Sequence, residues 1–167
     1  EIQSLDKLGL LNRNTVLVHG VGATKTEWDL IASKGSSLAW CPSSNLYMFN
    51  RTVDVSALKG KVDVVLGTDS TLTGSPTLLD EMRIAVGTGY ATAQDVTRMV
   101  GTTAAKVFGL PEPLIRVGNK ADLFVTPVGD LLNVHPRDIK IVIVRGEIKI
   151  VKTGKLRSYF EKKVGKK

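Results

Sequence analysis

The sequence predicts an α/β fold built on a parallel sheet, and three observations lead there. Short apolar runs rich in β-branched residues lie at 14–20, 36–42 and 62–68, each ending near glycine or proline. Their near-continuous hydrophobicity is typical of strands covered on both faces. Helical patterns separate the runs, whose starts lie a little over twenty residues apart. This spacing indicates right-handed β-α-β units.

The helices are predicted from their capping signals. Thr24 and Glu27 form a T-x-x-E capping box that opens the first helix, and residues 54–60 predict a short second one. Ser75-Pro76 predicts an N-cap followed by proline at the first helical position. A last helix is predicted from Thr92 to Gly109. The expected order is β-α-β-α-β-α-α.

The pattern changes after Asn119. Close-set strand signals follow, and IKIVIVRGEIKIV predicts a hairpin with Arg145-Gly146 at its tip. We therefore expect one domain over residues 1–112, a small β piece over 113–152 and a basic tail over 153–167.

Composition narrows the class of protein. The 167 residues are 43% hydrophobic and 23% charged, as in an ordinary globular domain. No apolar run approaches the ~20 residues that cross a bilayer, so no membrane partner is expected. With a single cysteine, Cys41, and no visible signal peptide, a cytoplasmic location is predicted. The start at Glu1 without methionine suggests part of a longer protein.

The net charge of +7 does not indicate a nucleic-acid partner. Seven basic residues against Glu161 place +6 of it after residue 151, which leaves +1 for residues 1–151. A nucleic-acid module would carry its basic residues on a folded face, often among aromatics. We interpret the run as a solvated tail.

Two strands end in reactive residues. His19 follows TVLV and Asp69 follows VVLGT, at the carboxyl ends where parallel α/β sheets place ligands and chemistry. Alternatives exist for both, since Asp69 could cap its turn through Thr71 or Thr73 and His19 could be a satisfied core histidine. The second histidine, His135, is interpreted as structural.

Two other motifs are set aside. HGVGATKT, residues 19–26, lacks both glycines of a phosphate-binding P-loop, with Thr24 directly before the lysine. Cys41 has no base at motif distance and is interpreted as a small buried hydrophobe.

Together these stretches resemble a family. VLVHGVGATKTEWDLIASKGSSLAWCPSSN and VDVVLGTDSTLTGSPTLLDEMRIA are similar to the second half of the barrel of the amidohydrolase superfamily, in its branch of cytosine, guanine and adenosine-type deaminases and chlorohydrolases. ATAQDVTRMVGTTAAKVFGL and KADLFV resemble its last barrel helix and the return to a small β-sandwich. The resemblance runs from about Leu8 to Lys152. Its markers are His19, Glu27, Pro42, Ser44, Asn45 and Gly67 to Ser70.

The resemblance implies a fold and roles. The chain would be the carboxy-terminal part of a TIM (β/α)8 barrel, strands six to eight, plus part of a small β-sandwich. Asp69 would bind a catalytic zinc or iron and shuttle a proton from the metal-bound water. His19 would face that water or the substrate, Asn45 and Ser70 would contact a small-molecule substrate, and Ser44 would shape the strand-seven end. The reaction would be hydrolysis of non-peptide C–N bonds, as in deamination of cyclic amidines or heterocycles.

The family's other metal ligands have no counterpart here. Its H-x-H, its strand-five histidine and its H-x-x-E are absent, and two histidines cannot complete a metal site. We expect the chain alone to be inactive and to hold no metal. Three strands cannot close a barrel, so the expected partner is the missing amino-terminal half or a second copy. The alternative is a non-catalytic α/β module that pairs with a partner through exposed sheet edges.

Overall fold

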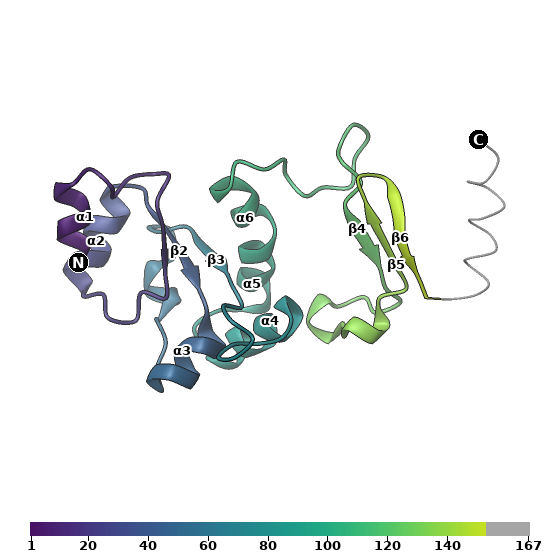
Figure 1. Cartoon of the computed structure of the whole chain (residues 1–167), viewed down its shortest axis with the longest axis horizontal. Coiled ribbons are helices and arrows are strands. Elements are labelled where there is room, and N and C mark those ends of the chain that lie inside the picture. The colour runs from purple at the N-terminus through teal and green to yellow at the C-terminus, as the bar shows by residue number, and fades with distance from the viewer. Residues whose placement is uncertain (153–167) are drawn as a thin grey trace. The chain divides into compact units, whose positions relative to one another are not determined.

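A computed structural model describes residues 1–152 of the chain, which divides into two compact units. The first spans Glu1–Pro113 and the second begins at Leu114 (Figure 1). Each unit contains one three-stranded sheet. The basic tail predicted for residues 153–167 lies outside the described residues.

The sheet of the first unit is parallel, in the order β1-β2-β3. Leu38 of the central strand pairs with Leu17 on one side and with Val64 on the other. β3 is buried throughout, whereas Val18 of β1 is 55% exposed. The predicted α/β class with a parallel sheet is confirmed for this unit. The strands are β1 (Val16–Val18), β2 (Ser37–Trp40) and β3 (Val64–Leu66).

Several helices begin where the capping signals predicted. Thr24 accepts the Glu27 amide and forms a complete capping box, and Thr92 does the same with Asp95. These side chains satisfy amide donors that a helix start otherwise leaves unpaired. The helices are α1 (Ile2–Lys7), α2 (Lys25–Ser33), α3 (Pro42–Phe49), α4 (Leu78–Gly87), α5 (Ala93–Val100) and α6 (Thr102–Val107), with a 3-10 turn η1 (Val55–Leu58).

Several elements differ from the prediction. The helices α1 and α3 were not expected. The cap predicted at Ser75-Pro76 is wrong, because the Thr77 hydroxyl accepts the Asp80 amide and α4 begins at Leu78. The segment 54–60 forms a 3-10 turn instead of an α-helix. The single helix predicted after Thr92 is two, since Gly101 leaves the helical region with φ −115° and ψ −102° between α5 and α6.

The second unit is an antiparallel sheet in the order β4-β5-β6. The predicted hairpin is confirmed, with Arg145 at φ 52° and Gly146 at φ 80° between its strands. Positive φ at both central residues is what a tight two-residue hairpin turn requires. Its elements are β4 (Leu123–Val125), η2 (Leu131–Asn133), η3 (Pro136–Asp138), β5 (Ile141–Val144) and β6 (Glu147–Val151).

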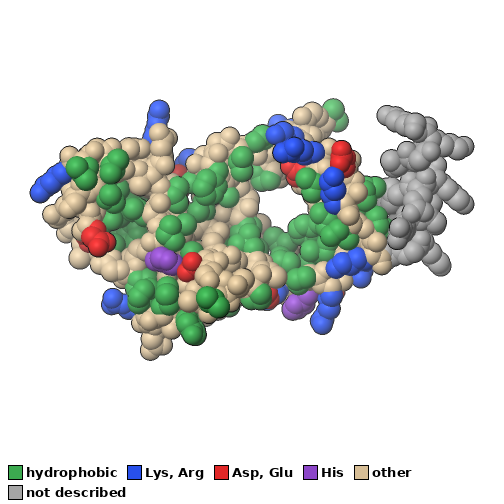
Figure 2. Space-filling model, in the orientation of Figure 1, with side chains coloured by type: hydrophobic (Ala, Val, Ile, Leu, Met, Phe, Trp, Pro, Cys, Tyr) green, Lys and Arg blue, Asp and Glu red, His purple; other side chains and the backbone are tan. Residues whose placement is uncertain are grey.

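The surface of the first unit carries large hydrophobic side chains as well as polar ones. On the face shown in Figure 2, hydrophobic side chains lie among small groups of Lys and Arg. α3 exposes Tyr47 at 72% and Phe49 at 50%. None of the helices in residues 1–152 is both long enough and apolar enough to cross a membrane.

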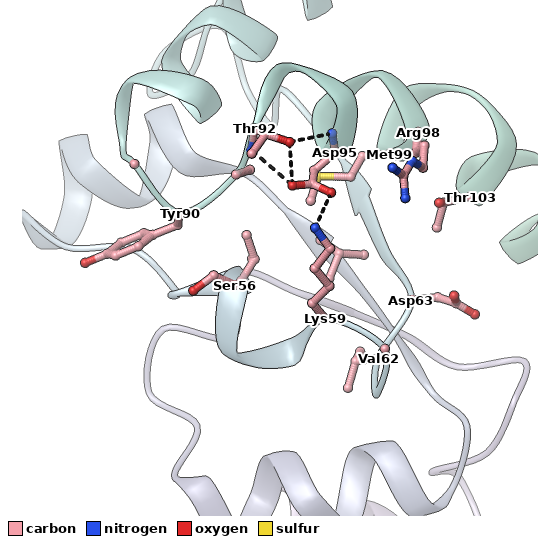
Figure 3. Close-up of a pocket in the computed structure, with 15 residues that line it drawn as sticks. Ser56, Lys59, Val62, Asp63, Tyr90, Thr92, Asp95, Arg98, Met99 and Thr103 are labelled. Atoms are coloured by element: carbon pink, nitrogen blue, oxygen red, sulfur yellow. Dashed lines mark hydrogen bonds and ion pairs between the residues drawn. The ribbon is translucent and has the colours of Figure 1, made fainter.

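A hollow of about 430 Å³ lies where η1 and the start of β3 meet α5 (Figure 3). Both of its carboxylates are paired: Asp95 accepts Lys59 Nζ at 2.9 Å, and Asp63 accepts Lys106 Nζ at 2.7 Å. Because it borders Val62 and Val64, the hollow lies at the amino-terminal end of β3, away from the end where parallel sheets place chemistry.

The Asp95 contacts predict an acid-sensitive contribution to stability. The hydrogen bond from Lys59, followed by those from Thr92, lowers the pKa of Asp95 to about 2. A lowered carboxylate pKa stabilises the fold above the ordinary value of about 3.9, and this contribution is lost as the pH falls toward 2. Since Lys59 is well exposed, we expect Asp95→Asn to cost only about 1 kcal/mol at neutral pH.

Urea unfolding between pH 2 and pH 7 measures this effect. The matched control is Asp29→Asn, which breaks an exposed i,i+4 pair with Lys25 and should leave the free energy of unfolding nearly unchanged. Equal losses in the two variants would contradict the role of Asp95.

Candidate active site

The candidate site lies at the edge of the first sheet where β1, β2 and β3 end, called here the carboxyl edge. His19 directly follows β1, Asn45 lies in the helix that begins after β2, and Asp69 follows β3. Because parallel strands end at the same edge, three segments far apart in sequence meet there. His19 Nδ1 lies 2.9 Å from Asn45 Oδ1, and His19 Nε2 lies 3.8 Å from Asp69 Oδ2.

His19 and Asp69 share an uncommon backbone conformation. Their φ angles are 67° and 58°, and only two other non-glycine residues of the described chain, Asn50 and Arg145, have positive φ. This conformation costs a non-glycine residue on the order of 1 kcal/mol or more, and such residues cluster at functional sites. The conformation of His19 is held from β2, since its amide donates to Ala39 O at 3.1 Å.

Asp69 is a partly open carboxylate. Its side chain is 30% exposed, although the strand before it is buried throughout. Ser44 Oγ donates to its Oδ2 at 2.5 Å and Thr73 Oγ1 lies at 3.4 Å. The Ser44 hydrogen bond is the main cause that holds the pKa of Asp69 below its ordinary value; the Ser70 amide and His19 act in the same direction.

His19 is not enclosed in the core, since its side chain is 31% exposed. Asn45, by contrast, is fully buried. Its Nδ2 donates to Thr52 Oγ1 at 3.1 Å, and the same hydroxyl accepts Trp40 Nε1 at 2.7 Å. The buried amide therefore links the histidine to the core strand β2.

The remaining predicted residues lie outside this network. The Ser70 hydroxyl accepts the Leu72 amide within its own turn, and Ser70 is exposed. Glu27 accepts the Thr24 amide and hydroxyl, as its capping role requires. Burial, with Asp69 and Glu81 nearby, raises the pKa of Cys41 to about 11, so its thiol is protonated at neutral pH and is a poor nucleophile.

Sequence reasoning missed Glu81. This fully buried residue of α4 accepts the Ser43 amide at 2.9 Å and the Ser43 hydroxyl. Ser43 Oγ in turn accepts the Ser75 amide at 3.0 Å. Glu81 thus ties the first turn of α3, which carries Ser44, to α4. Its only signal in the sequence is a charged residue on the apolar face of LLDEMRIAV.

The described residues alone do not complete a metal site. Asp69 and His19 offer one carboxylate and one imidazole, and no group of three or more His, Cys, Asp or Glu within residues 1–152 could hold a metal ion. A mononuclear zinc site needs about four ligands. A metal at the carboxyl edge would therefore need ligands from outside this part of the chain.

Comparison with known proteins identifies relatives. The model of the Amidohydrolase family matches residues 1–149. The chain is 31% identical over 166 residues to a 5-methylthioadenosine/S-adenosylhomocysteine deaminase of Haloarcula marismortui, covering 86% of this chain and 38% of that protein. It also resembles the crystal structure of a zinc-bound adenosine deaminase from Xanthomonas campestris, with a TM-score of 0.75 and 25% identity over 98% of this chain and 44% of that one.

A third comparison gives the same fold. The structure of Escherichia coli guanine deaminase matches with a TM-score of 0.73 and 24% identity, covering 89% of this chain and 42% of that one. The chain thus spans about two fifths of the length of these relatives.

The loop that holds Asp69 depends on Gly74. A Cβ added at Gly74 would lie 1.9 Å from Thr68 O and 3.3 Å from Ser43 Oγ, so the loop would have to move. We expect Gly74→Ala to lower the free energy of unfolding by more than about 2 kcal/mol. Gly87→Ala is the matched control, because a Cβ there meets nothing within 4 Å and should be neutral or stabilise the helix by up to about 1 kcal/mol. Denaturant unfolding tests both, and a neutral Gly74→Ala would contradict the close contact.

The Ser44 hydrogen bond can be tested by titration. Ser44→Ala removes the main cause of the lowered pKa, so the pKa of Asp69 should rise toward the ordinary value of 3.8. Ser70→Ala is the matched control, because it keeps the backbone amide that also favours the ionised form. Carboxyl ¹³C chemical shifts followed against pH measure both. An unchanged Asp69 pKa in Ser44→Ala would show that another group sets it.

Proposed function

Because the chain belongs to the amidohydrolase family, we propose that it is the carboxy-terminal portion of a metal-dependent hydrolase that deaminates cyclic amidines or aminated heterocycles. The observation that carries the proposal is the cluster at the carboxyl edge, where His19 lies 2.9 Å from Asn45 and 3.8 Å from Asp69, each from a different β-α segment. The named relatives are deaminases of small aminated molecules, which supports the same reaction class.

In hydrolytic deamination, water adds to the carbon that carries the amino group, the C–N bond breaks, and ammonia leaves. A zinc or iron ion, with Asp69 as one ligand, would supply Lewis-acid activation of the water when bound. The lowered pKa keeps Asp69 ionised at neutral pH. Its carboxylate can then take a proton from the attacking water and deliver it to the departing nitrogen.

His19 and Asn45 have different proposed roles. His19 Nε2 faces the same space as Asp69 and can orient the water or bind the substrate. Asn45 is fully buried and both ends of its amide are engaged, so we assign it the role of orienting His19. Its predicted direct contact with substrate would require His19 to move. Ser70 is exposed beside Asp69, and its contact with substrate stays a prediction.

The rest of the barrel would come from another segment. β1 has β2 as its only neighbour within the described sheet, and so does β3. We propose that the amino-terminal half of the barrel, or a second copy of this chain, pairs with these strands and supplies the other metal ligands. A non-catalytic interaction module is the second candidate, favoured by the hydrophobic side chains that α3 exposes. An H-x-H motif encoded upstream of Glu1 would decide for the enzyme.

The metal and the activity should appear together. We expect the 167-residue chain to bind no stoichiometric metal and to release no ammonia from aminated purine nucleosides. The same chain joined to its upstream sequence should hold about one zinc or iron and be active. In that protein Asp69→Asn should lower kcat by about 10²–10⁴-fold or more, as expected for losing a general acid–base group.

Elemental analysis and an ammonia-release assay measure these outcomes. The matched control is Asp29→Asn, an exposed carboxylate on α2, which should leave metal content and kcat unchanged. One equivalent of tightly bound metal on the 167 residues would show that the ligands are misidentified. An active Asp69→Asn enzyme would remove the aspartate from the mechanism.

A further inference from the structure

We propose that Thr52, held by Trp40, is a positioning residue that fixes which ring nitrogen of His19 carries the proton, acting through Asn45. The assignment of this tautomer rests on the geometry of the chain itself. Its importance for catalysis rests on the proposed function of His19.

Four side chains form a continuous hydrogen-bonded line from the core to the carboxyl edge. Trp40 Nε1 lies 2.7 Å from Thr52 Oγ1, and Asn45 Nδ2 lies 3.1 Å from the same oxygen. Asn45 Oδ1 lies 2.9 Å from His19 Nδ1. Trp40 and Asn45 are fully buried, so both are held in place by packing and water cannot replace their partners.

The donors and acceptors along this line follow one order. An indole N–H can only donate, so it occupies one lone pair of the Thr52 hydroxyl. The Asn45 amide donates to the other lone pair through Nδ2, which turns its acceptor oxygen toward His19. Since that oxygen can only accept, Nδ1 of His19 must carry the hydrogen. In the neutral ring Nε2 then keeps its lone pair.

The position of Nε2 agrees with this tautomer. Its distance of 3.8 Å from Asp69 Oδ2 is too long for a hydrogen bond, so Nε2 does not donate to the carboxylate. An unprotonated nitrogen and an ionised carboxylate that face one space form a pair of proton acceptors. A water or an amino group between them could donate one hydrogen to each and would thereby be held in one orientation.

The backbone brings Thr52 to its place. α3 ends at Phe49, and the next residue, Asn50, turns the chain with a left-handed φ of 50° while its amide donates a hydrogen bond to Leu46 O at 3.0 Å. Two residues later the chain passes the Trp40 indole, and the Thr52 hydroxyl meets it there. The reversal therefore serves the hydrogen-bonded line as well as ending the helix.

The test is a measurement of the His19 tautomer in the 167-residue chain. The protein has two histidines, so ¹⁵N-histidine labelling gives two imidazoles whose two-bond ¹H–¹⁵N correlations report the protonated nitrogen. The spectra are recorded at about pH 8.5, on the alkaline side of the ordinary histidine pKa of about 6.5. We expect the Nδ1–H form for His19. The Nε2–H form in the unmodified protein would overturn the proposal, since it would mean that Thr52 donates to a reversed Asn45 amide.

Variants of Thr52 then distinguish a specific change in the His19 tautomer from a general loss of folding. Thr52→Val keeps the branched shape without the hydroxyl and should shift His19 to predominantly the Nε2–H form, the tautomer favoured by free histidine. Thr52→Ser restores a hydroxyl and should restore Nδ1–H. Thr97→Val, which removes a hydroxyl bonded to Ala93 O on α5, is the matched control and should change nothing.

The signals of His135, in the second unit, show whether each variant remains folded there, and near-ultraviolet circular dichroism reports the packing of the tryptophans. An Nδ1–H tautomer that persists in a folded Thr52→Val chain would overturn the role of Thr52. Because no turnover is needed, failure of the deaminase assay would leave this result standing, and the reverse also holds.

Discussion

The parallel pairing of β2 with β1 on one side and β3 on the other is the constraint on which the carboxyl edge depends. It places the end of each strand beside the next, although His19 and Asp69 are fifty residues apart in the chain. Both residues then leave the strand direction with positive φ, and the hydrogen bond from His19 N to Ala39 O fixes one of these turns to the central strand. The order of the strands therefore brings the site residues near one another, and side-chain contacts then orient them.

The first turn of α3, which follows β2, is hydrogen-bonded to segments that follow both neighbouring strands. Its consecutive residues reach in different directions: Ser43 to Glu81 on α4, Ser44 to Asp69 after β3, and Asn45 to His19 after β1. Moving one of these residues would therefore disturb contacts on both neighbouring segments. The loop of Asp69 packs closely against this part of the chain, since a Cβ added at Gly74 would lie 1.9 Å from Thr68 O and 3.3 Å from Ser43 Oγ.

Local signals in the sequence were enough for the strands, for two helix starts and for one hairpin turn. The apolar runs, the capping boxes at Thr24 and Thr92, and the Arg145-Gly146 tip each depend on residues within a few positions of one another. α3 was missed because PSSN has the composition of a turn, although proline at a first helical position is a recognised start signal. The cap at Ser75 was predicted wrongly because the Thr77 hydroxyl, two residues later, accepts the Asp80 amide, while the Ser75 amide donates to Ser43 of a distant segment.

The site residues also differ in whether local sequence indicates them or a partner elsewhere in the chain gives them their role. The sequence could point to His19 and Asp69 because each follows an apolar strand directly, whereas Glu81 and Thr52 act through partners 38 and 7 residues away. No local pattern distinguishes a buried glutamate or a threonine that orients a neighbour from one that does not. In the proposed enzyme, the described residues would handle protons through the Asp69 carboxylate and the His19 imidazole, which Ser44 and Asn45 hold by hydrogen bonds. The other ligands of a metal site would then come from residues beyond them.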